Sequence, residues 1–454
     1  MELKGKNVLV VGAGKTGTVL AGFLIERGAR VTLNDRKPHP GDFRPPHPAV
    51  ETVWGGHPKD LFLSADLIFP SPGIPADLPV LEAARKQGIP VLGELELAAP
   101  FIDFPLIAIT GTNGKTTTTT LVGEILKKAG FPTFVGGNIG RPLLKACMSP
   151  KDYRWGVIEV SSFQLATAPS FHPRIAAILN MEADHLDWHP TLEDYYRAKW
   201  SITRNMEPED ILVLYAPLVE RRPGKIRAQI RTFTQEDNSS HSAWIANGTL
   251  CWRLGDDVLK IPAAELRVDQ RHLHLDMLAA GLIAAEAGVT PEVITATLRN
   301  FQGLPHRTAF VGEINGIRFI NDSKATNVDA VFWALKSLSK PIIWLAGGLW
   351  KGGDLSALDP LVKEKVKAVI AFGDSAGRFT RAFQSITPAQ KVETMEEAVI
   401  AAYRLARAGD TVLLSPACAS FDQFESYKER GQVFTAIVTS LKPKGDEIPY
   451  VSTE

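Results

Sequence analysis

Short apolar runs alternate with amphipathic stretches along most of this chain, and the alternation predicts α/β domains with mostly parallel sheets. Each short run predicts a buried strand, and each amphipathic stretch predicts a helix that covers a sheet. The predicted strands are 7–11, 30–34, 67–69, 90–92, 106–109, 155–160, 175–179, 341–346, 368–372 and 411–414, and the predicted helices include 18–27 and 117–128. Residues 233–261 are turn-rich and polar, which predicts a surface β excursion.

The alternation falls into three blocks, which predicts three domains. The chain has 454 residues, which is the length of about three domains of about 150 residues each. Residues 1–97 predict a Rossmann-like domain, and residues 98–302 predict a central P-loop ATPase-like domain with a parallel sheet. Residues 303–454 predict a C-terminal Rossmann-like α/β domain.

The composition excludes several other classes of protein. The 50 Lys and Arg residues balance the 50 Asp and Glu residues, so no general attraction to nucleic acid is expected. The cysteines, Cys147, Cys251 and Cys418, are too few and too scattered for a disulfide framework or a zinc site. The longest apolar runs fall short of the about 18 residues that cross a bilayer, so we expect no membrane insertion and a cytoplasmic location.

The strongest chemical signal is a glycine-containing loop between a predicted strand and a predicted helix. Residues 110–116 read Thr-Gly-Thr-Asn-Gly-Lys-Thr. Glycines let backbone N–H groups turn toward an anion, Lys115 can reach terminal phosphates, and Thr116 can ligate Mg²⁺. The general P-loop pattern has a further glycine where this chain has Ile109. A purely structural glycine turn is therefore the alternative interpretation.

A second glycine motif, GxGxxG at residues 12–17, lies between the first predicted strand and the first predicted helix. Asp35 follows at the end of the next strand, where an acidic residue can bind a ribose hydroxyl. Taken alone, this pattern also predicts a nicotinamide dehydrogenase or a structural turn. A hydride-transfer enzyme has no need of Lys115 and Thr116, so the two loops together favour two nucleotides in one enzyme.

The central block supplies the groups that phosphate chemistry needs. Glu159 ends a predicted strand, where its carboxylate can hold Mg²⁺ opposite Thr116. His185 lies in a polar loop after the next predicted strand, and a satisfied structural histidine is the alternative there. Thr191 predicts a helix N-cap. Lys199 lies two turns into that helix, and the sequence alone favours a solvated lysine.

These motifs, with others in the same order, resemble the Mur ligase family, and most closely its members that add D-glutamate. The resemblance covers nearly the whole chain. Its motifs are residues 12–17, 71–74, 111–116, 137–138, 159 with 161–165, 184–185, 196–199, 305–307, 321–327 and 415–424. The last two motifs are the specific ones, because other amino-acid-adding Mur ligases share the phosphate loop and lack these sequences.

The resemblance implies ATP-dependent amide formation in cytoplasmic peptidoglycan precursor synthesis. ATP would phosphorylate the L-alanine carboxylate of UDP-N-acetylmuramoyl-L-alanine, and D-glutamate would attack the acyl phosphate. The first block would then bind the uridine diphosphate, the central block ATP, and the third the amino acid. Two Mg²⁺ ions are implied, one of them near Lys199 as its carbamate, because carbamylation turns a repelling cation into a metal-binding anion. A monomer is expected.

The resemblance also implies a role for individual residues. The implied catalytic residues are Lys115, Asn138, Glu159, His185, Lys199 and Arg307. The implied ATP-binding residues are Gly111, Thr112, Asn113, Gly114, Lys115, Thr116, Thr117 and Arg307. The residues implied to bind the UDP-linked substrate are Gly14, Lys15, Thr16, Asp35, Arg36, Lys37, Ser71, Gly73, Asn138, Ser161 and Gln164. The residues implied to bind D-glutamate are Lys324, Thr326, Lys351, Ser420 and Tyr427. The implied metal ligands are Thr116, Glu159, His185 and the carbamate of Lys199.

Three departures from the family pattern limit this transfer. Residues 272–276 read His-Leu-His-Leu-Asp and lack both asparagines of an HNxxN pattern, which leaves the adenine contacts open. Lys37 replaces an arginine near the uridine phosphates, and Tyr427 stands where a phenylalanine is expected. A sister Mur ligase that adds another amino acid, an NAD-dependent dehydrogenase and a catalytically silent nucleotide-binding module remain the alternatives.

Overall fold

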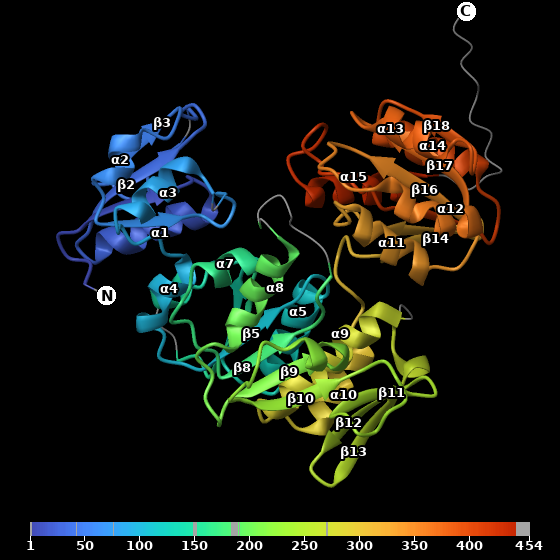
Figure 1. The fold of residues 1–454 in the computed structure, drawn as a ribbon. Helices are drawn as coiled ribbons and strands as arrows, with labels where there is room; N and C mark the ends of the chain where they lie inside the picture. The colour runs from blue at the N-terminus through green and yellow to red at the C-terminus, as the bar shows by residue number, and fades with distance from the viewer. Residues whose placement is uncertain are drawn as a thin grey trace, which may run out of the picture. The chain divides into compact units, whose positions relative to one another are not determined.

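A computed structural model describes residues 2–41, 43–75, 77–148, 152–182, 189, 191–268 and 271–441 (Figure 1). Its chain forms two compact units, whose main boundary falls between Phe301 and Gln302. Both units have sheets that are mostly parallel and covered by helices. The α/β fold class predicted from the alternation is therefore confirmed, while the division into domains 1–97, 98–302 and 303–454 stays a prediction.

The first sheet of the first unit has four parallel strands in the order β3-β2-β1-β4. The strands are β1 Asn7–Val11, β2 Arg30–Asp35, β3 Glu51–Trp54 and β4 Leu67–Pro70. Burial of β1 is complete after its first residue, because a parallel central strand is covered on both faces. This strand order is that of one half of a Rossmann fold.

Two details of this block differ from the prediction. The pattern does not predict β3, because Glu51–Trp54 has no apolar run and none of its residues is fully buried. Residues 90–92 are predicted as a strand but form only the single bridge between Ile68 and Val91. Pro90 has no N–H to donate, which limits the ladder at this edge.

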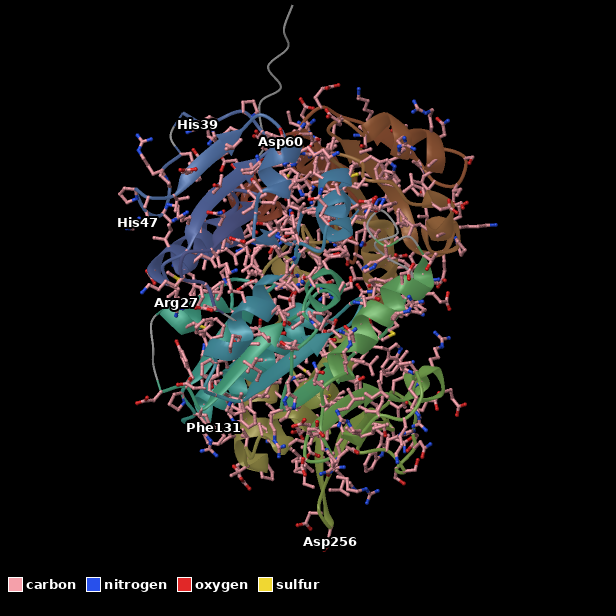
Figure 2. All side chains as sticks on the ribbon, turned by 60° about the vertical axis from the view of Figure 1, so that its left-hand side comes forward. Arg27, His39, His47, Asp60, Phe131 and Asp256 are labelled. Atoms are coloured by element: carbon pink, nitrogen blue, oxygen red, sulfur yellow. The ribbon has the colours of Figure 1, made fainter. Side chains whose placement is uncertain are left out.

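The second sheet of the first unit has nine strands in the order β13-β12-β11-β10-β9-β8-β5-β7-β6. Its strands are β5 Leu106–Thr110, β6 Thr133–Gly137, β7 Trp155–Glu159, β8 Ile175–Ile178, β9 Ile211–Tyr215, β10 Gln229–Phe233, β11 Ala243–Ala246, β12 Thr249–Leu254 and β13 Asp257–Pro262. The last three pair antiparallel, which confirms the β excursion predicted for residues 233–261. Asp256 is exposed at the tip of the turn between β12 and β13 (Figure 2).

Two helices of the first unit begin directly after glycine turns. α1 covers Lys15–Glu26 and α5 covers Lys115–Lys128, so both begin earlier than predicted. Their N-caps, Gly14 and Gly114, have no side chain to mark the start of the helix. The remaining helices are α2 Lys59–Leu63, α3 Pro79–Lys86, α4 Glu94–Ala98, α6 Leu144–Met148, α7 Ser162–Ala166, α8 Leu192–Trp200, α9 Arg271–Glu286 and α10 Pro291–Asn300, with 3₁₀ turns η1 Ala99–Phe101, η2 Ser201–Thr203, η3 Ala216–Arg221 and η4 Ala263–Glu265.

The second unit has one sheet of six strands in the order β14-β15-β19-β16-β17-β18. Its strands are β14 Ala309–Ile314, β15 Ile317–Asn321, β16 Ile342–Gly347, β17 Val366–Phe372, β18 Ala389–Lys391 and β19 Thr411–Leu414. Among the strand pairs in the described part of this unit, only the edge pair of β14 and β15 is antiparallel. The helices are α11 Val328–Ser337, α12 Asp359–Lys365, α13 Ala376–Phe383, α14 Met395–Leu405 and α15 Tyr427–Ser440, with the 3₁₀ turn η5 Leu355–Leu358.

The strand order of the second unit decides where its loops meet. β19 is last in the chain but pairs with both β15 and β16. The loops that follow these three parallel strands therefore leave from the same edge of the sheet, where α/β proteins bind ligands. Below this edge, the fully buried Trp344 of β16 packs against Phe379 and Phe383 of α13. None of the helices in the described residues is long and apolar enough to cross a membrane.

Candidate active site

The predicted phosphate loop connects β5 with α5. Gly114, the N-cap of α5, has a left-handed backbone with φ of +82°. A Cβ atom at this position would lie 2.1 Å from Oδ1 of Asp276, a nearly buried residue of α9. Both the backbone conformation and the close approach therefore require glycine here. Asp276 occupies one of the positions where the family pattern has asparagine, and its carboxylate lies against the loop.

The side chain of Asn180 holds the loop in place. Its Oδ1 accepts hydrogen bonds from the backbone N–H groups of Thr112 and Asn113, at 2.9 and 2.8 Å. Its Nδ2 donates to the carbonyl of Asn113 at 3.1 Å. These two N–H groups thus serve the conformation of the loop itself. Sequence reasoning missed Asn180, although its place just after β8, the neighbour of β5, was an available signal.

Two lysines converge on the first carbonyl of the loop. Nζ of Lys115 donates to the carbonyls of Gly111 and Thr112, both at 2.8 Å. Nζ of Lys199 also donates to the carbonyl of Gly111 at 2.8 Å and lies 4.5 Å from the ring centroid of Tyr195. Lys199 is 1% exposed, so the interpretation of a solvated lysine was wrong. The two ammonium groups make the loop suitable for an anion.

Tyr195 links Lys199 to the loop and was also missed by sequence reasoning. It is fully buried, and its hydroxyl lies 3.0 Å from Oγ1 of Thr112. Thr191 caps α8 as predicted, because its Oγ1 accepts the N–H of Asp194 at 3.1 Å. The cap fixes where α8 begins, and the helix then buries Tyr195 and Lys199 one turn apart. The pattern of apolar residues along α8 does not predict which face is buried, because the buried face includes the charged Lys199.

Glu159 connects two of the other candidate residues, Thr116 and Asn138. Its Oε2 accepts a hydrogen bond from Oγ1 of Thr116 at 2.7 Å, and its Oε1 accepts one from Nδ2 of Asn138 at 2.9 Å. The carboxylate and the hydroxyl are oxygen donors of the kind that Mg²⁺ prefers, so these residues fit one Mg²⁺ ion. No group of three His, Cys, Asp or Glu that could hold a metal ion by itself occurs within the described ranges. A Mg²⁺ ion here would complete its ligand shell with phosphate and water.

The predicted second metal position is described only in part. His185 lies outside the described residues. As an ammonium group, the Lys199 side chain donates to the carbonyl of Gly111 and cannot ligate a cation. Only the carbamate form would provide oxygen ligands. Both the second ion and the carbamate therefore stay predictions.

The first glycine motif forms a tight turn after β1. A Cβ atom on Gly17 would lie 1.8 Å from the carbonyl oxygen of Gly12, so no other residue fits there. The carbonyl of Gly12 also accepts the hydroxyl of Ser71 at 3.0 Å. Asp35 accepts the N–H groups of Ala13 and Lys37, at 2.8 and 3.0 Å. Both oxygens of the Asp35 carboxylate thus stabilise the turn by accepting backbone N–H groups.

Several other residues predicted for the UDP-linked substrate lie at the carboxyl edge of the same sheet. Gly14, Arg36, Lys37 and Gly73 are exposed there, and Thr16 is half-buried. Lys15 reaches the loop that follows β6, where its Nζ donates to the carbonyl of Gly140.

Ser161 and Gln164 form the N-terminal capping box of α7. Gln164 Oε1 accepts the backbone N–H of Ser161 at 3.1 Å, while Ser161 Oγ accepts the N–H of Gln164 at 3.3 Å. In the part of the chain that the structure describes, the buried Nε2 of Gln164 has no hydrogen-bond partner. These two side chains thus have a structural role that the prediction of substrate contacts did not include.

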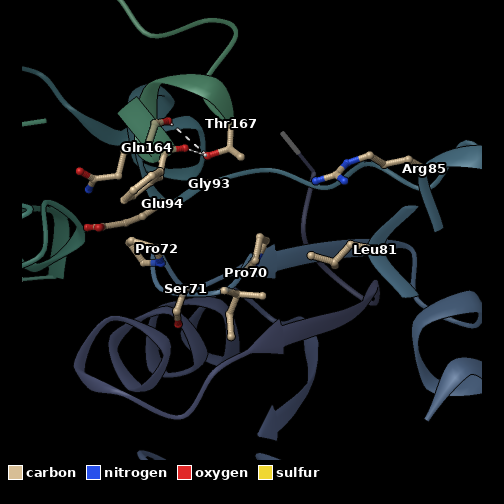
Figure 3. Close-up of a pocket in the computed structure, with 11 residues that line it drawn as sticks. Pro70, Ser71, Pro72, Leu81, Arg85, Gly93, Glu94, Gln164 and Thr167 are labelled. Carbon is tan, nitrogen blue, oxygen red and sulfur yellow. Dashed lines mark hydrogen bonds between the residues drawn. The ribbon is translucent and has the colours of Figure 1, made fainter. Parts of the chain in front are cut away.

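A small cavity lies beside α7 (Figure 3). The residues that line it are Pro70, Ser71, Pro72, Ile74, Leu81, Arg85, Gly93, Glu94, Phe163, Gln164 and Thr167. Burial raises the pKa of Glu94 to about 7, although the N–H groups of Leu144 and Leu143 oppose the shift. The Glu94 carboxylate accepts the Leu144 N–H at 3.0 Å and thereby holds the start of α6.

The second unit brings all five residues predicted for D-glutamate to one edge of its sheet. Lys351 Nζ lies 3.4 Å from Thr326 Oγ1. Lys324 Nζ lies 4.1 Å from the ring centroid of Tyr427, a cation–π distance. Ser420 is buried on the loop after β19. Two cations with neighbouring hydroxyl groups suit a ligand that carries carboxylates.

Arg307 lies in the second unit beside a buried carboxyl group. Its positive charge lowers the pKa of Asp322, but burial dominates and raises that pKa to about 7. Asp322 accepts hydrogen bonds from Ser415 Oγ at 2.8 Å and from the N–H of Thr308 at 3.0 Å. His306 and Thr308, on either side of Arg307, have positive φ angles of 64° and 47°. Such strained backbone is concentrated at functional sites in proteins.

Three family models match consecutive parts of the chain. Residues 6–93 match the N-terminal domain of MurD-like Mur ligases, residues 109–258 match the Mur ligase middle domain, and residues 306–418 match the Mur ligase glutamate ligase domain. The three matches follow one another in the order of the three predicted blocks.

Two relatives that match nearly the whole chain carry the same name. The chain is 42% identical over 450 residues to the UDP-N-acetylmuramoylalanine–D-glutamate ligase of Koribacter versatilis, covering 97% of this chain and 99% of that protein. It is 43% identical over 457 residues to the protein of the same name from Pelotomaculum thermopropionicum, covering 96% and 98%.

Solved structures agree in fold. The UDP-N-acetylmuramate-alanine ligase MurC of Thermotoga maritima aligns with a TM-score of 0.59 at 18% identity, over 96% of this chain and 99% of that one. The MurF ligase of Thermotoga maritima, solved in complex with ADP, aligns with a TM-score of 0.58 at 16% identity, over 96% and 95%.

Proposed function

The chain belongs to the Mur ligase family, and on that premise we propose that it joins D-glutamate to UDP-N-acetylmuramoyl-L-alanine at the expense of ATP. Relatives at 42% and 43% identity carry the name of this activity. The observation that carries the choice of amino acid is the cluster of Lys324, Thr326 and Lys351 beside Tyr427 and Ser420. D-Glutamate has two carboxylates, and this cluster offers two cations and hydroxyl donors.

The first half-reaction activates the acid. A carboxylate oxygen of the alanyl group attacks the γ-phosphorus of ATP, the bond from phosphorus to the bridging oxygen breaks, and ADP leaves. Both reactants are anions, so charge must be neutralised before they reach bonding distance. We assign this task to Lys115 on the phosphate loop, with Arg307 and Asn138 as further contacts. One Mg²⁺ held by Thr116 and Glu159 would supply further neutralisation at the phosphates.

The second half-reaction forms the amide bond. The neutral amine of D-glutamate attacks the acyl carbon, the bond from that carbon to the phosphate oxygen breaks, and inorganic phosphate leaves with the electron pair. The amine proton passes to a base or to solvent. We assign Lys324, Thr326, Lys351, Ser420 and Tyr427 to hold the D-glutamate carboxylates during this step. Their role is orientation, which lowers the entropic cost of the attack.

The UDP-linked substrate is assigned to the turn after β1 and its neighbours. Charge is the main argument, because Lys15, Arg36 and Lys37 lie around a glycine turn of the kind that accepts a pyrophosphate. Asn138 and Ser161 are assigned to the muramoyl end. The second Mg²⁺, the carbamate of Lys199, a monomeric state and a cytoplasmic location belong to the same proposal.

The deciding experiment is a phosphate-release assay with purified protein. Phosphate should appear only when ATP, UDP-N-acetylmuramoyl-L-alanine and D-glutamate are all present. Turnover with L-alanine and UDP-N-acetylmuramate, or with a diamino acid in place of D-glutamate, would identify a sister ligase. NADH binding that ATP does not affect would favour a dehydrogenase. Absence of turnover on every substrate set would favour a silent nucleotide-binding module.

A further inference from the structure

Arg430 is a fully buried residue in the second unit, in the first turn of α15. Its guanidinium donates four hydrogen bonds to other parts of the chain. Nε donates to Ser323 Oγ at 3.0 Å, and Nη1 donates to the carbonyl of Ala419 at 3.2 Å. Nη2 donates to the carbonyls of Ser323 and Cys418, at 2.8 and 3.0 Å. Most of its donor capacity is thus used on two separate loops.

The buried charge has no carboxylate partner at ion-pair distance in the described part of the chain. Burial lowers the pKa of Arg430 to about 10, while Cys418, Asp422 and Asp322 oppose the shift. The Asp322 carboxylate instead accepts hydrogen bonds from Ser415 Oγ and from the backbone N–H of Thr308. The Asp422 carboxylate accepts the backbone N–H of Asp374 at 3.2 Å. An ordinary structural ion pair therefore does not account for this arginine, because carbonyl dipoles surround its charge.

The groups bound by Arg430 directly precede predicted D-glutamate contacts. Ser323 precedes Lys324, and the Cys418 and Ala419 carbonyls precede Ser420. The hydroxyl of Ser323 also donates to the carbonyl of Tyr427 at 2.8 Å. One side chain thus touches the backbone beside two contact residues, and through Ser323 it reaches a third.

The loop that carries Lys351 meets the same guanidinium. A Cβ atom on Gly348 would lie 3.1 Å from Nη1 of Arg430, so the loop approaches the arginine closely. Leu349 and Ala419 exchange backbone hydrogen bonds of 2.9 and 3.0 Å, which pair this loop with the loop after β19. The loops after β15, β16 and β19 and the start of α15 therefore converge on Arg430.

We infer that Arg430 is a positioning residue for the amino acid, which fixes the spacing of Lys324, Lys351, Ser420 and Tyr427 and adds attraction for a dicarboxylate. The inference rests on the proposed function. A guanidinium suits this task because its planar fork presents donors in fixed directions to several loops at once. A lysine at the same place would retain the charge but would present one mobile ammonium group.

The test compares Arg430→Lys with Arg381→Lys, a matched exchange at an exposed position of α13. We expect Arg430→Lys to raise KM for D-glutamate by about tenfold or more, with KM for ATP and for the UDP-linked substrate within about twofold. Arg381→Lys should change none of the three. An unchanged KM for D-glutamate in folded Arg430→Lys would overturn the inference. An equal loss of kcat/KM for all three substrates, together with a lower Tm, would also overturn it. That result is expected of an arginine with a merely structural role.

A milder variant keeps the inference testable if Arg430→Lys does not fold. Ser323→Ala removes one acceptor of the guanidinium and should raise KM for D-glutamate by about three- to fivefold. Hydrogen exchange supplies a readout that needs no substrate, since residues 322–326, 348–353 and 416–421 should exchange faster in either variant while β16 and β17 keep their protection. Unchanged exchange in these three loops would contradict positioning. If the parent protein releases no phosphate with D-glutamate, the proposed function fails, and exchange still decides whether Arg430 holds the loops.

Discussion

The phosphate loop of the first unit and the amino-acid site of the second unit are both held by buried or half-buried cations that donate to backbone carbonyls. In the first, Lys115 and Lys199 converge on Gly111, within one short loop. In the second, Arg430 spans loops that are far apart in the sequence. The difference follows from the chemistry, since a mobile ammonium can transfer from a carbonyl to a phosphate, whereas a four-bonded guanidinium is fixed. We therefore expect the first site to respond to a ligand and the second to be preformed.

The largest expected effect is at Lys115. Lys115→Ala removes the mobile cation of the phosphate loop and should lower kcat by about 10³-fold, the scale of a lost transition-state charge contact. Tm should change little, because the lysine is only partly buried and its two acceptors are loop carbonyls. Lys128→Ala, at the exposed end of the same helix, is the control. Phosphate release and thermal unfolding are the measurements, and retained turnover in Lys115→Ala would contradict the assignment of the loop.

The next largest effect is expected at Lys199, the second lysine that donates to the phosphate loop. If it acts as a carbamate, Lys199→Met should still bind ATP but lose about 10²-fold in turnover. Stability should hold, because replacing a buried charge by an apolar side chain of similar length removes a desolvation cost. In the parent protein, ¹³C-labelled bicarbonate should give a carbamate carbonyl resonance that is missing from Lys199→Met. A metal-loaded crystal at neutral pH that shows a plain ammonium group would end the carbamate hypothesis.

The sequence predicted the structure that one continuous segment determines, but not the structure that depends on contacts between distant segments. β1, β19 and the phosphate loop were predictable, because each is one continuous run of residues with its own pattern. β3 was not, since its four residues are no more apolar than a loop and are placed by pairing with β2. Burial of Lys199 was not predictable either, because it depends on a carbonyl 88 residues away.

The candidate site shows this limit most clearly. The motifs around Lys324 and Ser420 were found only through a resemblance to a family, since nothing local relates residues about a hundred positions apart. Asn180 and Arg430 act by bonding to distant backbone. Asn180 at least follows a predicted strand, whereas a single arginine near the start of a helix gives no sign of such partners. Residues that stabilise the loops of a site without contacting the ligand are thus the hardest to predict.

A smaller effect is expected on the pH dependence of stability, to which one buried carboxyl group in each unit contributes. Burial raises the pKa of Glu94 and of Asp322 to about 7, from the ordinary values of 4.5 and 3.8. Between those limits the folded protein binds more protons than the unfolded chain, so stability should fall as pH rises from about 4 to about 7 and then level off. Glu94→Gln and Asp322→Asn stay neutral, and each should reduce this fall by about 1–3 kcal/mol.

The measurement is denaturant unfolding at pH 5 and pH 8, with one variant in each unit. Glu393→Gln, at a side chain that is 78% exposed, is the control and should leave the pH dependence unchanged. A parent protein that becomes more stable between pH 5 and pH 8 by the same amount as both variants would show that neither carboxyl group is protonated in the fold.

The smallest expected effect separates the ring of Tyr427 from its hydroxyl. Tyr427→Phe keeps the aromatic face that lies 4.1 Å from Lys324 Nζ, so KM for D-glutamate should change by less than about threefold. Tyr427→Leu removes the face and should raise that KM by about two- to fivefold, the size of a half-exposed cation–π contact. Because Ser323 bonds to the backbone carbonyl of residue 427, neither variant should disturb the loops that Arg430 holds. A change of tenfold in Tyr427→Phe would mean that the hydroxyl itself binds the amino acid.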